Sequence, residues 1–280
     1  MIESIRMKLP HGLQQFLTFG ILQARACIFA GSFFVLLFLS NHIPLGPIPR
    51  YDFLFVSAVL LQIILIATKI ESKDEAKTIF LFHLIGLFLE WYKTQPSIAA
   101  WSYPEFSYLR LGTVPLYSGF MYAAVGSYIS QSWRLMKLSV TNYPPYKYSI
   151  PLSVAIYVNF FTRHFIPDIR IFLGLLVVIV FWKTIVHYQV NEKRYRMPLV
   201  VAFLLIGFFI WIAENISTYW GAWEYPNQID RWSLVYFHKI SSWALLVIIS
   251  VIIVFDLKLF KEKHQSPITA LPPDDSSTTP

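Results

Sequence analysis

The sequence predicts an all-α, polytopic membrane helix bundle of about eight transmembrane helices, arranged as two repeats with parallel orientation. Of the 280 residues, 56% are hydrophobic and only 14% are charged, whereas soluble proteins average about 25% charged residues. The mean hydropathy of +0.53 implies more apolar surface than a soluble domain of this length buries. A motif that occurs twice predicts the two repeats.

Apolar runs long enough to cross about 30 Å of hydrocarbon mark the expected spans, because a helix rises about 1.5 Å per residue. In chain order they lie at residues 14–40, 52–70, 77–93, 113–136, 148–164, 169–190, 198–219 and 233–257. The first is expected to be a retained helix, since Arg25 interrupts its apolar run and no small-x-small cleavage site follows. The fourth carries Gly119 and Gly126, which favour close helix packing.

These spans predict a single membrane domain over residues 1–259, with one repeat at about 14–137 and the other at about 148–258. The fifth span is short and rich in polar residues. Residues 260–280 are rich in Pro, Ser, Thr and Asp, which have little to bury, and are expected to form a disordered cytoplasmic tail.

Lysine and arginine predict the orientation, because they concentrate in cytoplasmic connections. With the N-terminus inside, 14 of the 23 basic residues fall in cytoplasmic segments and 6 on the opposite side. Both termini are therefore expected in the cytoplasm, with the chain in the cell membrane and the lipid bilayer as its partner. The net charge of +7 is attributed to this topology, so no nucleic acid is predicted, and no protein partner can be inferred.

A short motif occurs once in each predicted repeat. Each copy has a glutamate near the end of an apolar helix, a threonine four residues later and then a Trp-x-Tyr-Pro turn, and the glutamates are 124 residues apart. The copies contain Glu90, Thr94, Trp101 and Tyr103, and Glu214, Thr218, Trp223 and Tyr225. Two copies at matched positions predict a duplication. The turns are expected to anchor the chain at the membrane surface; the alternative is that Trp101 and Trp223 wall an apolar pocket.

Ionisable side chains inside a bilayer cost at least about 2.5 kcal/mol each, so they are expected to face a cavity, the protein interior or a partner. Several polar residues have a similar predicted depth, which predicts a pocket that opens to the outer face. Beside the motif residues, the candidates for binding a substrate there are Arg25, His83, Asn159, Arg163, Asn215, His238 and Lys239. For Arg25, pairing inside the bundle is the preferred interpretation.

Glu90 and Glu214 are the candidate catalytic residues, because a pair of carboxyl groups can divide acid and base roles or relay protons. The alternative is that they pair with Lys239, Arg163 or Arg25 and lock helices together. Histidines lack the spacing of a metal motif, so no metal is predicted. No nucleotide-binding glycine loop or nucleophile elbow is present, and no cofactor is predicted. The single Cys27 excludes an internal disulfide.

Long stretches of the chain also resemble a known family. They read FGILQARAC, EWYKTQPSIAAWSYPE, VPLYSGFMYAAVGSYI, YVNFFTRHFIPDIR and IAENISTYWGAWEYPNQ. They resemble the bacterial membrane family called domain of unknown function 817 (DUF817), over nearly all of residues 14–257. The resemblance implies a multi-pass bacterial membrane protein and no particular reaction. The motif layout is also similar to membrane carotenoid cyclases and hydratases, which imply acid–base chemistry without a redox cofactor; no catalytic role is carried over.

Three functions follow as hypotheses. The first is an intramembrane enzyme that performs acid–base chemistry on a lipophilic polyprenoid or lipid at the two glutamates. The second is a transporter or permease for a small solute, which parallel repeats favour. The third is a membrane scaffold without catalysis. A cavity that opens toward lipid favours the first, a shaft that continues toward Lys183 the second, and a closed, fully paired cluster the third.

Overall fold

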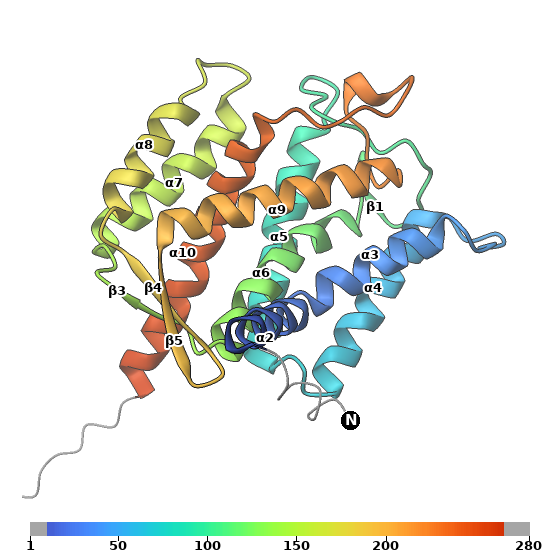
Figure 1. The fold of residues 1–280 in the computed structure, drawn as a ribbon. Coiled ribbons are helices and arrows are strands. Elements are labelled where there is room, and N and C mark those ends of the chain that lie inside the picture. The colour runs from blue at the N-terminus through green and yellow to red at the C-terminus, as the bar shows by residue number, and fades with distance from the viewer. Residues whose placement is uncertain (1–9, 266–280) are drawn as a thin grey trace, which may run out of the picture.

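The computed structural model describes residues 10–265 and is mostly helical over that range (Figure 1). The helices are α2 (His11–Ala26), α3 (Ile28–Ser40), α4 (Arg50–Ala67), α5 (Lys73–Lys93), α6 (Ser118–Leu135), α7 (Tyr146–Thr162), α8 (Arg170–Phe181), α9 (Leu199–Tyr219) and α10 (Lys239–Gln265), with a 3₁₀ turn η1 (Pro226–Gln228). The short strands are β1 (Arg110–Leu111), β2 (Val114–Pro115), β3 (Ser139–Thr141), β4 (Ile185–Val190) and β5 (Lys193–Pro198).

Two of these helices, α4 and α9, are each long and apolar enough to cross a membrane. The bent pair α2 and α3 passes the same test as one unit, while α8 and the Lys239–Phe255 part of α10 are apolar but shorter. Large apolar side chains such as Leu60, Ile63 and Leu204 lie exposed on the two long helices. Within the described residues the helices are therefore compatible with membrane association, although eight spans do not appear among them.

The predicted span 169–190 is wrong in its second half. Helix α8 ends at Phe181, and residues 185–190 form strand β4 of a three-stranded antiparallel sheet in the order β3-β4-β5. The segment Ile-Val-His-Tyr-Gln-Val is rich in residues that favour strands. Asn191, with a φ of 53°, begins the two-residue turn of a hairpin, a position that favours asparagine. Apolar content alone did not distinguish this strand from a helix.

Other predicted boundaries also need correction. The span 14–40 is two helices that meet at Cys27 with a bend of 68°. Helix α5 begins at Lys73, four residues earlier than predicted, because Ser72 and Glu75 form a capping box. Helix α10 reaches Gln265, so the first residues of the predicted disordered tail are helical, and the remainder of that tail lies outside the described residues.

The two predicted repeats share a packing pattern. In the first, α3 packs on α4 and α6, and α5 packs on α6; in the second, α7 packs on α8 and α10, and α9 packs on α10. Glycines allow the close crossings. A Cβ at Gly119 would lie 2.7 Å from the His83 carbonyl oxygen, and one at Gly207 would lie 2.9 Å from the Ala244 nitrogen. Helices α6 and α10 join the halves at the centre of the molecule (Figure 1).

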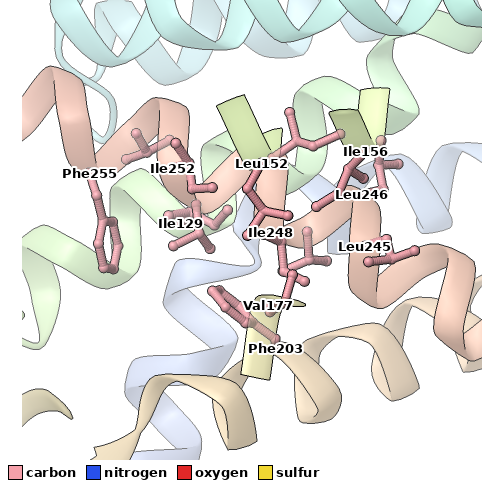
Figure 2. Packing of buried hydrophobic residues seen from close by; sticks show 14 of the residues in the cluster. Ile129, Leu152, Ile156, Val177, Phe203, Leu245, Leu246, Ile248, Ile252 and Phe255 are labelled. Atoms are coloured by element: carbon pink, nitrogen blue, oxygen red, sulfur yellow. The ribbon is translucent and has the colours of Figure 1, made fainter. Parts of the chain in front are cut away.

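Much of the hydrophobic core gathers around α10. Figure 2 shows Leu245, Ile248 and Ile252 of this helix in one cluster with Phe203 of α9 and Val177 of α8. These side chains are nearly fully buried. The connections 94–117, 163–169 and 220–238 lie together at one end of the molecule, opposite the β4–β5 hairpin (Figure 1). We call this end the site end, since it contains both repeated motifs.

Candidate functional site

Glu90 lies in the last turn of α5, is 3% exposed and accepts three hydrogen bonds. Trp101 Nε1 and Tyr103 Oη each donate to its Oε2 over 2.6 Å, and Tyr122 Oη donates to Oε1 over 2.7 Å. Burial, followed by the Glu90 carboxylate, raises the pKa of Tyr103 well above its usual value, so this phenol keeps the proton that it donates. The Trp-x-Tyr-Pro turn after α5 thus folds back onto its own glutamate.

Glu214 repeats this arrangement on α9 with fewer donors. It is 2% exposed, and Trp243 Nε1 of α10 donates to its Oε2 over 2.7 Å. Tyr225 of the second Trp-x-Tyr-Pro turn donates to Oε1. Trp223 is not among the donors to Glu214. Glu214 therefore has two donors where Glu90 has three.

Two of the aromatic side chains that donate to Glu90 pack against the two that donate to Glu214. The rings of Trp101 and Tyr225 meet edge to face at 6.2 Å between centroids, and those of Tyr122 and Trp243 lie 6.4 Å apart. We call these four residues the aromatic box. Each carboxyl is bonded to one ring of each pair, so the two glutamates meet in one niche through aromatic side chains.

The two Trp-x-Tyr-Pro turns also touch through their backbones. Ser102 and Glu224, the variable residues of the two motifs, form a reciprocal pair: each backbone N–H donates to the other carbonyl, over 2.9 and 3.0 Å. Arg50 reinforces this contact, because its guanidinium bonds the Glu105 carboxylate and the Trp220 and Gly221 carbonyl oxygens. We call this assembly the motif seam.

A cavity of about 50 Å³ lies inside the aromatic box. All four box residues line it, together with apolar Leu89, Phe160 and Leu246. Its polar lining consists of Glu214, Lys93, Arg163, Lys239 and Ser242. A volume of this size holds a small number of water molecules or a small chemical group. Glu214 lines the cavity directly, whereas Glu90 lies behind the rings that it holds.

Three cations line this cavity against one carboxyl group. The Lys93 ammonium donates to His164 Nε2 over 2.9 Å, and the Lys239 ammonium lies 4.2 Å from the centre of the Tyr225 ring. Burial, followed by the charges of Lys93, Arg163 and Lys239, lowers the pKa of His164 to about 4. His164 is therefore neutral at pH 7 and adds no positive charge to the three cations. Among the described side chains, no carboxylate lies within 4.0 Å of these three cations.

Several residues predicted to bind a substrate lie elsewhere. Arg25 and His238 are exposed, and His83 is buried against Phe120 with a ring separation of 4.4 Å. None of the three lines the cavity. Asn159 is buried on α7 outside the cavity lining. Three other predicted residues, Thr94, Asn215 and Thr218, form hydrogen bonds with the backbone.

These three side chains bond main-chain atoms near the motifs. Thr94 donates to the Glu90 carbonyl oxygen over 3.0 Å, and Thr218 donates to the Asn215 carbonyl oxygen over 3.2 Å. Asn215 Oδ1 accepts from the Val235 N–H over 2.9 Å and so holds the loop before α10. This loop explains why α10 begins six residues later than predicted, at Lys239, and why His238 lies outside the helix.

Sequence reasoning missed Tyr122 and Trp243, the two helix-borne members of the aromatic box. A signal for them existed: Tyr122 follows Tyr103 by 19 residues and Trp243 follows Tyr225 by 18. An aromatic donor at a matched distance past each motif marks the same place in each half. Lys93, in the last turn of α5, was likewise not predicted as a site residue.

A second cavity of about 90 Å³ lies farther along the same central helices, toward the β3-β4-β5 sheet. Its lining is mostly apolar and includes Ile129 of α6, Phe203 of α9 and Phe255 of α10. Lys183 lines neither cavity. In the searched residues no three His, Cys, Asp or Glu side chains come together as a metal site.

Comparisons with known proteins match nearly the whole chain. The family model described as protein of unknown function (DUF817) matches residues 15–251. The chain is 53% identical to the uncharacterized protein YoaT of Bacillus subtilis (strain 168) over 258 residues, which cover 92% of this chain and 96% of that protein. No solved structure matches. The family resemblance is confirmed, and neither match is a carotenoid cyclase or hydratase.

Proposed function

We propose, on the premise that this chain belongs to the DUF817 family of proteins of unknown function, that it is a membrane-embedded enzyme that performs acid–base chemistry on a lipophilic substrate. The observation that carries the proposal is the position of Glu214, whose carboxyl group lines a cavity with both apolar and cationic walls. Ligand sites typically combine apolar and aromatic walls with placed polar groups that orient the ligand.

Glu214 is the residue that we assign to proton transfer. Tyr225 and Trp243 each bond one of its oxygens, and a carboxylate has about four lone-pair positions. Positions therefore remain for a substrate in the cavity. In the proposed step, the carboxylate takes a proton from a bound C–H or O–H group and returns it to another atom of the same molecule, so no external oxidant or reductant is needed.

Glu90 is assigned a positioning role. Its three bonds go to Trp101, Tyr103 and Tyr122, and it does not line the cavity. Two of these partners are walls of the cavity, so Glu90 fixes the shape of the space in which Glu214 would act. Catalytic sites depend on such support, because a reacting group must be held to within about 0.5 Å.

The proposal includes the duplication and the membrane topology expected from the sequence. The shared packing pattern of the two halves and the reciprocal pair of Ser102 and Glu224 support a duplication. Exposed apolar side chains on the helices support a lipid environment. Eight spans, a bacterial cell membrane and cytoplasmic termini remain part of the proposal. The topology is tested with a cysteine substituted at Lys147, expected on the cytoplasmic side, or at Asp230, expected on the opposite side, by comparing its labelling in intact cells and in lysed cells.

The test of the enzymatic proposal compares Glu214→Gln with Glu192→Gln, whose side chain lies exposed at the tip of the β4–β5 hairpin. Both variants are expressed in cells that lack the protein, at equal levels in the membrane fraction. Chromatography of extracted lipids, with mass spectrometry of each separated isomer, is expected to show one lipid that accumulates, and one that is lost, with Glu214→Gln but not with Glu192→Gln. If the wild-type protein and Glu214→Gln give the same lipid profile, the proposal is wrong.

A second candidate function is transport of a small solute. The two cavities lie one after the other along α6, α9 and α10, and parallel repeats occur in transporters. Against this, the second cavity is mostly apolar and Lys183 lines neither. Uptake of solutes into vesicles that contain the purified protein distinguishes the two: a transporter changes the contents of the vesicle without changing the chemistry of the solute.

A further inference from the structure

The cavity inside the aromatic box has an excess of positive charge. Lys93, Arg163 and Lys239 line it, and Glu214 is its one acidic lining residue. The neighbouring Arg170 is already paired, with Asp168 at 2.5 Å, and its other nitrogen donates to Ser242 at the cavity wall. The Lys93 ammonium contacts the His164 imidazole, and the Lys239 ammonium lies over the Tyr225 ring, whose hydroxyl is bonded to Glu214.

Such a group of cations is unfavourable on its own. Buried charges normally have a partner, because removing a charge from water without one is expensive. Lys93 is 1% exposed, so water cannot compensate it as it would at the surface. Three cations around about 50 Å³ also repel one another. An anion in the cavity removes both unfavourable terms at once.

We infer that this cavity binds the phosphate group of a phosphorylated ligand, with Lys93, Arg163 and Lys239 as its contacts. A guanidinium offers paired N–H donors that match phosphate oxygens, and ammonium groups add charge. The apolar lining residues Leu89, Phe160 and Leu246 would contact the first carbons of an apolar chain, and the rest of that chain would extend beyond this volume. The inference rests on the proposed function in one respect: it names the proposed lipophilic substrate as a lipid phosphate, such as a polyprenyl phosphate.

The site requires no bound metal for this recognition. Three cations provide the compensation that a phosphate needs, and the Ser242 hydroxyl adds a polar atom at the same wall. Glu214 lines the same cavity as these cations, so a phosphate bound there would place the first carbons of the attached chain beside its carboxyl group. Acid–base chemistry would therefore occur close to the phosphate end.

The experiment uses the full chain purified in a non-ionic maltoside detergent, which supplies no phosphate of its own. Binding is followed by tryptophan fluorescence, since Trp101 and Trp243 line the cavity. The probes are farnesyl phosphate, uncharged farnesol and inorganic phosphate. Farnesyl phosphate is expected to bind at least tenfold more tightly than farnesol. If inorganic phosphate binds as tightly as farnesyl phosphate, the phosphate site holds but its ligand is free phosphate rather than a lipid.

Variants test which residues provide the site. Lys239→Met and Arg163→Gln are each expected to weaken binding of farnesyl phosphate by about tenfold to a hundredfold, because each removes a charge-assisted contact. Lys239→Arg keeps the charge and should retain most of the affinity. Lys147→Met, an exposed lysine far from the cavity lining, is the matched control. Equal binding of farnesol and farnesyl phosphate by the wild-type protein, or no binding of either phosphate, overturns the inference without any variant.

The test of phosphate binding and the test of the proposed reaction can succeed or fail independently. Glu214→Gln removes a negative charge from the cavity wall and should bind farnesyl phosphate at least as tightly as the wild-type protein does. If it does so while cellular lipids are unchanged by the same substitution, the phosphate site stands and the proposed reaction fails. If lipids change but farnesyl phosphate binds no better than farnesol, the reaction stands and the phosphate site fails.

Discussion

Replacement of Glu90 is the sharpest test of how the niche is built. Glu90→Ala removes the acceptor of three buried hydrogen bonds, from Trp101, Tyr103 and Tyr122. A buried donor left without a partner costs about 1–3 kcal/mol. Water that enters the space left by the side chain can satisfy some of these donors. We therefore expect the free energy of unfolding to fall by about 3–5 kcal/mol, which is near the lower end of the summed cost for three unpaired donors.

Glu90→Gln keeps the volume of the side chain but removes its charge and reduces the number of hydrogen bonds that it can accept. The amide oxygen accepts two hydrogen bonds but the amide nitrogen accepts none, so one of three donors loses its acceptor. The expected loss is about 1–2 kcal/mol. Combined with Tyr122→Phe, which removes one of the donors, the loss should be smaller than the sum of the two single losses, because the residues share a contact.

Unfolding of the purified protein in mixed micelles of maltoside and dodecyl sulfate provides the measurement, with far-UV circular dichroism as the signal. Glu192→Gln, at the exposed hairpin tip, is expected to stay within about 0.5 kcal/mol of the wild-type value. If Glu90→Ala is as stable as this control, Glu90 does not hold the aromatic box, and its assigned positioning role is refuted.

Three further outcomes follow from the same contacts. Gly119→Ala should lose about 1–3 kcal/mol of unfolding free energy, because its Cβ would lie 2.7 Å from a carbonyl oxygen; Gly174→Ala, with open space around it, should be near neutral, and equal losses would contradict the crossing geometry. Arg50→Met should lose about 2–4 kcal/mol in the same micelles, since it breaks several bonds of the motif seam. The pKa of His164 is about 4 in the folded protein, so the unfolded chain takes up a proton at a higher pH than the folded chain does. The free energy of unfolding should therefore decrease as the pH falls from about 6.5 toward 4. His164→Asn should make this pH dependence weaker, and an unchanged dependence would assign it to other groups.

The repeated motif allowed most of the site to be predicted from the sequence. Glu90 and Glu214, with Trp101 and Tyr225, follow from linear spacing alone, because each glutamate and its turn lie within one helix end and its loop. Tyr122 and the equivalent donor on α10 could not be found in this way. They reach the carboxyls only through the packing of α6 on α5 and of α10 on α9, which local sequence does not encode.

The fold was predictable in class and less so in detail. Apolar content identifies helices such as α4 and α9, but it gives the same signal for the strand at residues 185–190. The bend at Cys27 has no proline that would predict it. The loop before α10 is as apolar as a helix, but its Val235 N–H donates to the Asn215 side chain instead of to a helical carbonyl oxygen. In each case a tertiary hydrogen bond or a change of backbone direction overrides the hydrophobic pattern.

The motif seam has a consequence for motion. The two halves of the chain are fastened at the site end by the Ser102–Glu224 pair and by the Arg50 guanidinium. They are also joined at the opposite end, where the Gln189 N–H donates to the Met136 carbonyl oxygen over 2.8 Å and Asn191 bonds the Thr18 hydroxyl. A rocking movement of one half against the other, of the kind that alternating access uses, would therefore have to break hydrogen bonds at both ends of the molecule.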